Sequence, residues 1–332
     1  MRLRNANAAS KYNYQLVVLD DECKPSTGVQ VATKAAADQT IVAGITHYCS
    51  AVAIATMGTY HRFNLPIVVW GSVLPEVTYG NKFPEVHRVN GTMIDGDRDA
   101  SKFMRSRGYK TWVVIHDTTD YGKGHLKYFS EALNSDGGQI IGTFAVSSDQ
   151  QDFTAELTKI KSLKPDVVYV GGLVPLAVRV RSQMEKVGVD AQFQGTGGIL
   201  SDGFIAGLGK SAEGALAFRE GAAVEKLPGG QKFLSLYENQ GFEGPPEAYG
   251  PFAFAASDLL IDVIEKVGPS RSAIIEELNA KKEWDSIIGK IAFDDHGQNT
   301  VSATTLYVVQ DGKWQVWDQS EYASGKRHLN SK

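Results

Sequence analysis

The sequence has little cysteine, no long apolar run and no excess of positive charge. Its 332 residues include only two cysteines, Cys23 and Cys49, and the net charge is −4. No run approaches the roughly 18 apolar residues of a membrane-spanning helix. The first residues, MRLRNANAASKYNY, carry two arginines without the apolar core of a signal peptide. Without a basic stripe we expect no nucleic-acid partner, and the length suits two domains.

Motifs of catalysis and cofactor binding are incomplete. The stretch 195–198 is glycine-rich, but Leu200 stands where the dinucleotide fingerprint needs its third glycine. The stretch 209–211 ends like a P-loop but lacks the first glycine of that motif, and the seven histidines are scattered. We therefore expect no cofactor, no metal site and no enzyme activity. The alternative is acid–base chemistry by His116 and Asp117; otherwise His116 is a strand-end histidine that hydrogen-bonds its neighbours.

Short apolar runs alternate with amphipathic stretches, a pattern typical of parallel sheets covered by helices on both faces. The predicted strands are 15–19, 40–44, 66–70, 111–116, 139–146, 167–171 and 192–196. The predicted helices are 28–37, 51–63, 96–107, 122–134, 153–163, 176–187 and 248–267. Later segments 290–293, 304–309 and 313–317 alternate like antiparallel strands, with hairpin turns at 296–297 and 311–312.

Ligands of open α/β sheets bind beyond the carboxyl ends of the strands. The residues there are 20–23, 47–50, 71–74, 117–121, 172–176 and 195–199. Among them Ser50 begins a predicted helix, and the free N–H groups of a helix N-terminus favour an anion. Cys23 and Cys49 both follow predicted strands, which could bring them within bridging range. On spacing alone, a disulfide and two buried free thiols both stay open.

Short motifs follow one another in a definite order: 20–25, 44–50, 75–76, 115–117, 121–124, 152–153, 166–172 and 212–214. In that order and spacing they resemble the periplasmic solute-binding proteins of branched-chain amino acid ABC transporters, the leucine/isoleucine/valine-binding type. The resemblance runs from about Tyr14 to Trp317. It implies an α/β, type I periplasmic binding protein fold with two lobes, each a mostly parallel sheet flanked by helices. It also implies a non-enzymatic receptor that closes on a small ligand between its lobes and delivers it to a membrane permease.

The resemblance assigns roles to individual residues. It implies a disulfide between Cys23 and Cys49, a carboxylate contact at Ser50, and a tyrosine, Tyr121, that closes over the ligand from the second lobe. Three further ligand positions depart from the family pattern. Val73, with Ser72 before it, replaces a threonine; Gly197 or Gly198 replaces the glutamate that accepts from the ligand's ammonium; and Leu173 replaces a second tyrosine.

These departures suggest a changed ligand, because a buried ammonium without an acceptor is costly. We expect the carboxylate contact to be kept and the ammonium contact to be lost. The ligand would then have a carboxylate or amide head and an apolar or aromatic body. Tyr48, Tyr249, Trp70 and Phe252 could contact such a body, although for Trp70 and Phe252 we favour the alternative that they are simply core residues.

The family pattern also predicts lobe boundaries and surroundings. We expect lobe one to comprise 1–91 and 221–302, lobe two 92–220 and 303–332, and hinges near 89–92, 218–221 and 301–304. The protein would be a monomer in the periplasm that binds an amino acid or a related carboxylate for an ABC importer. The alternative is a cytoplasmic ligand-sensing regulator on the same scaffold, similar to amide sensors. The absent signal peptide favours the sensor, whereas the cysteine pair favours an oxidising compartment.

The beginning of the chain departs from the family pattern as well. Family members have a signal peptide, a strand, a turn and a helix before the segment that matches Gln15. We therefore expect the N-terminal strand and helix to be missing and this chain to be poorly stable on its own, since its neighbours would have unpaired backbone edges.

Overall fold

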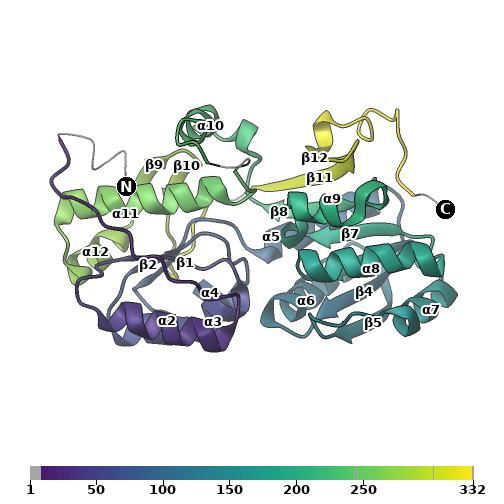
Figure 1. The fold of residues 1–332 in the computed structure, drawn as a ribbon, viewed down its shortest axis with the longest axis horizontal. Coiled ribbons are helices and arrows are strands. Elements are labelled where there is room, and N and C mark those ends of the chain that lie inside the picture. Colours follow the sequence, from purple (N-terminus) through teal and green to yellow (C-terminus); the bar gives the residue numbers. More distant parts are fainter. Residues whose placement is uncertain (1–8, 243, 245, 302, 331–332) are drawn as a thin grey trace. The chain divides into compact units, whose positions relative to one another are not determined.

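The computed structural model describes residues 9–330 apart from 243, 245 and 302. In the family pattern Met1 would stand near the end of the first helix, and residues 1–8, where that helix would end, lie outside the described part. The chain forms two compact units (Figure 1), each built from separate stretches of sequence. Unit 1 is Met1–Gly91 with Val224–Ser302, and unit 2 is Thr92–Ala223 with Ala303–Lys332. Within the described residues, no helix is both long and apolar enough to cross a membrane.

Unit 1 contains a small parallel sheet, in the order β1-β2-β3, with α11 over one face and α2 and α3 over the other (Figure 1). Its strands are β1 (Gly44–Thr46), β2 (Ile67–Val69) and β3 (Val86–Arg88), followed later by the hairpin of β9 (Glu283–Ser286) and β10 (Gly289–Ala292). Its helices are α2 (Pro25–Ala37), α3 (Ser50–Arg62), α4 (Glu76–Tyr79), η3 (Val224–Lys226), α10 (Gly230–Glu238), α11 (Gly250–Val267) and α12 (Arg271–Leu278). The core is formed mainly by the apolar face of α11.

The predicted strand at 15–19 is wrong. These residues have no regular structure, and Leu16, Val17 and Val18 are 59%, 54% and 79% exposed. An apolar run becomes a strand only where a neighbouring strand offers hydrogen bonds. Among the described residues, β1 pairs with β2 alone, so the run 15–19 has no strand partner. Cys23 accordingly follows an irregular segment, not a strand.

The second predicted strand, 40–44, lies later than expected, at β1. The reason is a turn at Asp38, whose carboxylate accepts hydrogen bonds from the N–H and hydroxyl of Thr40 at 2.9 and 2.7 Å. Arg271 fixes the same turn. Its guanidinium donates to the carbonyls of Asp38 and Ile41, and also to those of Ala36 and Phe63 at the ends of α2 and α3.

Unit 2 contains a seven-stranded sheet in the order β12-β11-β8-β7-β6-β4-β5 (Figure 1). All pairs are parallel except those of β11, which runs antiparallel to β8 and β12. The strands are β4 (Thr111–Asp117), β5 (Gln139–Val146), β6 (Val167–Gly171), β7 (Gln192–Thr196), β8 (Leu216–Glu220), β11 (Thr304–Gln310) and β12 (Lys313–Val316). The helices are α5 (Met93–Ser106), α6 (Asp120–Ser135), α7 (Thr154–Leu163), α8 (Val174–Val187), η1 (Gly197–Ile199), α9 (Asp202–Leu208), η2 (Gly209–Ala212) and η4 (Trp317–Gln319).

The two predicted hairpins have different outcomes. Asp311 and Gly312 have φ of +53° and +71° and join β11 to β12, as expected. Gly297, with φ of +72°, also lies in a turn, but β10 pairs with β9 instead of with a later strand. A single bridge between Phe293 and Asn299 closes that turn.

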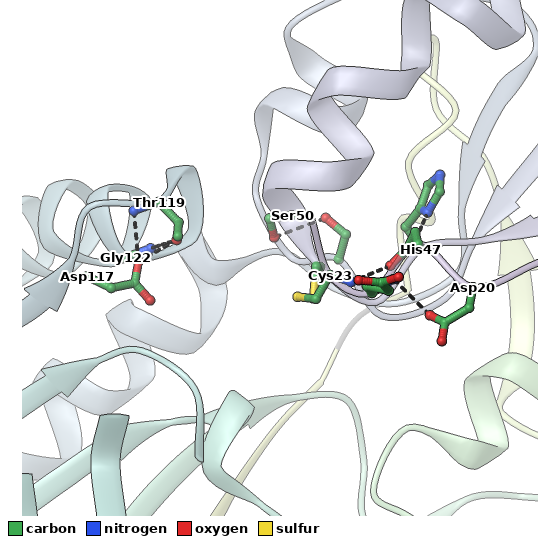
Figure 2. The surroundings of a disulfide bond; sticks show 11 residues. Asp20, Cys23, His47, Ser50, Asp117, Thr119 and Gly122 are labelled. Atoms are coloured by element: carbon green, nitrogen blue, oxygen red, sulfur yellow. Dashed lines mark hydrogen bonds and ion pairs between the residues drawn. A yellow bond between two sulfur atoms is a disulfide. The ribbon is translucent and has the colours of Figure 1, made fainter. Parts of the chain in front are cut away.

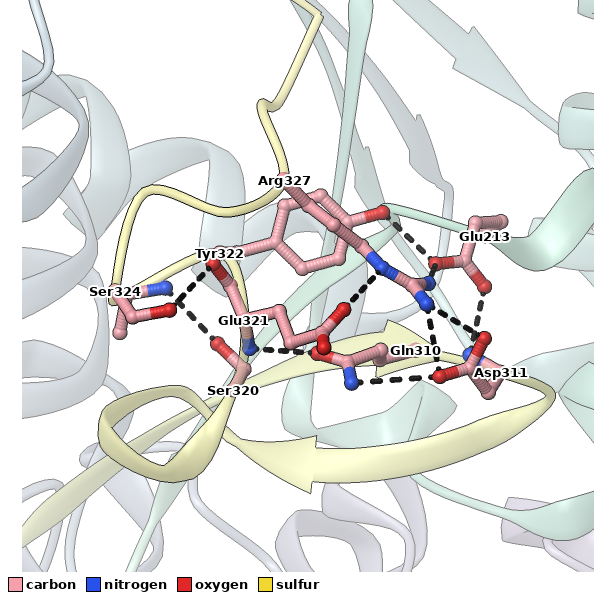
Figure 3. Close-up of polar contacts among 9 residues, drawn as sticks. Glu213, Gln310, Asp311, Ser320, Glu321, Tyr322, Ser324 and Arg327 are labelled. Atoms are coloured by element: carbon pink, nitrogen blue, oxygen red, sulfur yellow. Dashed lines mark hydrogen bonds and ion pairs between the residues drawn. The ribbon is translucent and has the colours of Figure 1, made fainter.

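The last described segment contacts the rest of unit 2 through several side chains, among them Arg327 (Figure 3). Arg327 donates to carboxylates of Glu213, Asp311 and Glu321 at 2.7–2.9 Å. Tyr322 donates to Glu213 at 2.9 Å in the same cluster. The arginine lowers the pKa of the Asp311 carboxyl through this hydrogen bond. Side-chain contacts thus attach the segment after β12 to the sheet.

Candidate functional site

A disulfide joins the two cysteines at the start of two helices of unit 1 (Figure 2). Cys23 and Cys49 have Cα atoms 5.5 Å apart, and Cys49 is the N-cap of α3. This confirms the pairing that the resemblance implied. Glu22 and Cys23 have left-handed φ of +52° and +56°. Asp side chains stabilise that turn, since Asp20 accepts from the N–H of Glu22 and Asp21 from that of Cys23, both at 2.8 Å.

A buried histidine joins this turn to the sheet. His47 follows β1, and its Nδ1 lies 2.8 Å from the carboxylate of Asp21. Its Nε2 lies 2.8 Å from the hydroxyl of Tyr60 and 3.0 Å from that of Thr56. The hydrogen bond to His47 is the largest of the effects that lower the pKa of Asp21. The residues before the helix N-terminus are therefore held in place by both a disulfide and a buried polar network.

Two serine hydroxyls meet at the N-terminus of α3. Ser50 is its first residue, and the hydroxyl of Ser72, which follows β2, donates to the hydroxyl of Ser50 at 3.0 Å. Both side chains are buried, at 1% and 0% exposure. The unpaired N–H groups of the first helical turn and the two hydroxyls form a neutral set of donors suited to one small anion. Val73, beside Ser72, is buried and apolar.

A second buried network positions the loop that carries Ser72. Arg88 donates to the carbonyls of Ser72 and Leu74 at 3.3 and 2.6 Å, and its Nε donates to Gln298 at 2.6 Å. Asn90 also donates to the Ser72 carbonyl at 3.2 Å, and Gln298 donates to the Asn90 carbonyl at 2.8 Å. Arg88, Asn90 and Gln298, which lie shortly before the two points where the chain leaves unit 1, therefore support the loop that carries Ser72.

The four aromatic side chains predicted to contact a ligand body lie next to one another in unit 1. Tyr48, 37% exposed, has its ring 5.9 Å from Trp70 and 5.7 Å from Tyr249. Tyr249 and Phe252 are buried in the core of unit 1, and Trp70 packs against that core. Of this set, Tyr48 is the most exposed tyrosine and Tyr249 is its edge-on neighbour.

In unit 2, Tyr121 is bound to the carboxyl end of β7. Its hydroxyl donates to the hydroxyl of Thr196 at 2.8 Å and accepts from the N–H of Gly198 at 3.2 Å. A Cβ atom at Gly198 would lie 2.6 Å from the Tyr121 hydroxyl and 2.8 Å from Leu173. The position must therefore be glycine for these side chains to pack as they do. Gly197, the preceding residue, is buried in η1.

The structure thus gathers the predicted site residues into two sets. Unit 1 brings Ser50 and Ser72 together, and separately Tyr48 and Tyr249; unit 2 brings together Tyr121, Leu173 and the glycines. His116, the catalytic alternative, is buried, and its Nδ1 lies 2.8 Å from the carbonyl of Asp117. It hydrogen-bonds its neighbour, as the non-catalytic interpretation predicts.

Sequence reasoning missed the residues that support these sets. Arg88 and Gln298 are 210 positions apart, and no motif joins them. His47 was found only as a strand-end residue, without its partner Asp21. Two local features could have indicated this pair: His47 stands at the end of a strand, and Asp21 belongs to an acidic turn just before Cys23.

Comparison with known proteins assigns the chain to a family. Residues 1–313 match the family described as periplasmic binding protein. The chain belongs to this family. It is a family of binding proteins and not of enzymes, in agreement with the incomplete catalytic motifs.

Individual periplasmic binding proteins match most of the chain. An amino acid binding protein of Pseudomonas aeruginosa is 28% identical over 93% of this chain and 83% of its own length. The Leu/Ile/Val-binding protein BraC3 of Rhizobium johnstonii is 28% identical over 90% of this chain and 81% of its own. These relatives, like the resemblance, are of the amino acid and Leu/Ile/Val-binding kind.

Solved structures share the fold. A leucine binding protein, LivK, of Thermotoga maritima has a TM-score of 0.86 at 24% identity, covering 95% of this chain and 90% of that one. A solute binding protein from R. palustris, solved with benzoate, has a TM-score of 0.83 at 20% identity, covering 95% and 88%. At this identity the likeness shows the type I α/β fold and nothing finer.

Proposed function

We propose that this chain is the substrate-binding component of an ABC importer and that it captures a small carboxylate. The observation that carries the proposal is the pair of buried hydroxyls, Ser50 and Ser72, 3.0 Å apart at the N-terminus of α3. Donors of this kind suit a carboxylate, because hydroxyls, free N–H groups and the helix dipole all favour negative charge. Membership of the family supports a membrane permease as the partner and a periplasmic location, and the disulfide supports an oxidising compartment.

The ligand class that we propose is an acid without an ammonium group next to its carboxylate. The eight proposed contacts, Tyr48, Ser50, Ser72, Val73, Tyr121, Leu173, Gly197 and Tyr249, include no carboxylate side chain. A glutamate at Gly198 would require the Tyr121 hydroxyl and the Leu173 side chain to move from their positions here, since its Cβ would lie 2.6 and 2.8 Å from them. Tyr48 and Tyr249 would pack against the apolar or aromatic body of the acid. A related protein solved with benzoate makes an aromatic acid a natural probe.

The residues of unit 2 are proposed as the second set of ligand contacts. The resemblance assigns Tyr121, Leu173 and Gly197 to the ligand. Tyr121 already shares its hydroxyl with Thr196 and Gly198, so it would meet the ligand mainly through its ring. Leu173 adds an apolar surface where a tyrosine is usual in the family.

A thermal-shift and calorimetry series tests the proposal. The probes are L-leucine, its 2-oxo acid and benzoate, each added to the purified chain. We expect the 2-oxo acid or benzoate to bind more tightly than leucine. Stabilisation by leucine alone would contradict the proposed class, and no response to any of the three would contradict the carboxylate assignment.

Matched variants locate the binding. Ser50→Ala should weaken binding of the responding acid about tenfold to a hundredfold, as expected for one hydrogen bond to a charged group. Ser257→Ala is the control, because among the described residues the Ser257 hydroxyl bonds the carbonyl of Ala253 within α11 and no other group. Equal affinities for the two variants would remove Ser50 from the site.

A further inference from the structure

Unit 2 contains a buried group of ionisable side chains behind Tyr121 that the proposed function does not use. Asp97 of α5, His125 of α6, Tyr169 of β6 and Glu220 of β8 are 3%, 1%, 1% and 2% exposed. His125 Nδ1 lies 3.0 Å from both carboxylate oxygens of Asp97 and 3.0 Å from the Tyr169 hydroxyl. Tyr169 donates to Asp97 at 2.9 Å, which closes a triangle of three polar groups.

A gain in folding stability does not explain why Asp97 and His125 are buried together. Removing two charges from water costs several kcal/mol, and apolar replacements of such pairs are often neutral or stabilising. Buried polar groups can instead fix one arrangement of the side chains around them. The neighbour whose arrangement the pair could fix is Tyr121.

Tyr121 and His125 are one turn apart on α6 and pack against each other. Their ring centroids are 4.6 Å apart with planes at 79°, an edge-to-face contact. His125 Nε2 has no hydrogen-bond partner among the described residues, so Nδ1 alone orients the ring through Asp97 and Tyr169. The orientation of His125 therefore determines the surface on which Tyr121 packs.

The contact continues beyond Tyr121 to the strand ends. The Tyr121 hydroxyl donates to Thr196 Oγ1, and Thr196 in turn donates to the carbonyl of Gly172 at 3.2 Å. A chain of contacts thus joins Asp97 on α5 to the carboxyl ends of β6 and β7. These strand ends carry the unit 2 residues that we proposed as ligand contacts.

We propose that the buried Asp97–His125 pair is a positioning device for Tyr121 and sets its orientation at the carboxyl end of β7. The effect on ligand binding rests on the proposed function; the positioning of Tyr121 does not. Because His125 can gain or lose a proton, the orientation of Tyr121 depends on pH. The ionisable groups facing His125 are Asp97, Tyr169, Tyr121, Glu220, Asp117 and, across Gly171, His116.

Burial by itself would lower the pKa of His125, but the carboxylates of Asp97, Glu220 and Asp117 together raise it above its usual range, so the charged form persists to higher pH. Tyr121 should keep the orientation described here while His125 is charged. The orientation of Tyr121 should change when His125 loses its proton.

Nuclear magnetic resonance on the ligand-free protein tests the positioning directly. Tyrosine rings are labelled with carbon-13, and the Tyr121 signal is assigned with Tyr121→Phe. We expect this signal to follow the titration of His125 with the same midpoint, and to lose its pH dependence in His125→Asn. The double variant Asp97→Leu with His125→Leu replaces both charges by apolar groups and serves if a single variant fails to fold.

Leu133→Ala is the matched control on the same helix. Leu133 is fully buried, so its truncation destabilises unit 2, yet it lies 12 residues after Tyr121. We expect no change of the Tyr121 signal in this variant. A Tyr121 signal in Asp97→Leu with His125→Leu that matches the unaltered protein at every pH would overturn the proposal.

Affinity separates this inference from the proposed function. Binding of benzoate and of the leucine 2-oxo acid is measured with each variant. We expect about two- to tenfold weaker binding in the double variant, the size of one displaced aromatic contact. If the Tyr121 signal moves while affinity stays constant, the positioning role stands and the assignment of Tyr121 to the ligand is wrong.

Discussion

The sheet of unit 2 has seven strands, of which β6, β7 and β8 are buried along their whole length, whereas the sheet of unit 1 has three strands of three residues each. Backbone ladders therefore hold unit 2 together over a wide area. In unit 1 the ladder is short, and the aliphatic run 16–18 is exposed and belongs to no strand. Two units of the same fold thus depend on different interactions.

Unit 1 compensates with bonds made by side chains. The disulfide joins the starts of α2 and α3, Arg271 joins their ends to the following turns, and Arg88 with Gln298 holds the loop after β2. The same bonds place Ser50 and Ser72. We infer that the interactions that stabilise unit 1 also build its half of the proposed site.

Removing the disulfide should have the largest effect on this comparison. Cys23→Ser with Cys49→Ser opens a loop with a sequence separation of 26 residues. The chain-entropy estimate for such a loop is about 3–4 kcal/mol of unfolding free energy. Urea unfolding, followed for each unit separately by hydrogen exchange, should show the loss in unit 1. An equal loss in unit 2 would mean that the units do not differ as described.

Lowering the pH should have the second-largest effect, because it should reduce the stability of unit 1. Burial lowers the pKa of His87, on β3, to about 4 from 6.5. The unfolded chain therefore binds a proton below pH 6.5 that the folded unit 1 binds only near pH 4, and stability falls as the pH falls through this window. The loss is about 3 kcal/mol. Unfolding measured between pH 7 and 4 should show a smaller slope in His87→Gln.

His125 makes the stability of unit 2 depend on pH in the opposite direction. The pKa of His125 is raised in the folded protein. The part of the folding stability that comes from this shift is therefore complete below the pKa that His125 has in the unfolded chain, and it is lost as the pH rises through the pKa in the folded protein. The two units should therefore respond to pH in opposite directions. Identical slopes for the exchange of unit 1 and unit 2 peptides would break this part of the comparison.

The smallest expected effect comes from a matched pair of substitutions, one arginine in each unit. Arg271→Ala leaves the carbonyls of Ala36, Ile41 and Phe63 without their donor, and we expect a loss of about 2–3 kcal/mol in unit 1. Arg327→Ala removes three contacts to solvent-exposed carboxylates in unit 2, where exposed ion pairs contribute little. Differential scanning calorimetry should show a clear shift for the first and almost none for the second.

The sequence predicted the strands of unit 2 better than those of unit 1, for a physical reason. β5, β6 and β7 match their predicted bounds; β6 and β7 are buried runs with a strand partner on each side, whereas β5 is an edge strand that pairs with β4 alone. Residues 15–19 looked equally strand-like, but a strand needs a partner that periodicity cannot reveal. β3 and β8 were missed because their buried Arg88, Arg219 and Glu220 hide the apolar pattern.

The proposed site shows the same division. Ser50 could be found because a strand followed by a helix N-terminus is a local pattern. Arg88, Asn90 and Gln298, which support Ser72, come together only in the folded unit, over separations of 208 and 210 residues. The pairing of Asp97 with His125, 28 positions apart on two helices, likewise has no local signature.

The most direct test of the account is hydrogen exchange of the intact protein with and without a reductant. We predict that reduction speeds exchange in peptides covering β1, β2 and α3 and leaves β4, β6 and β7 unchanged, as it should also in Cys23→Ser with Cys49→Ser without reductant. Exchange that is unaffected in unit 1, or accelerated equally in unit 2, would contradict the claim that side-chain bonds in one unit replace the ladder of the other.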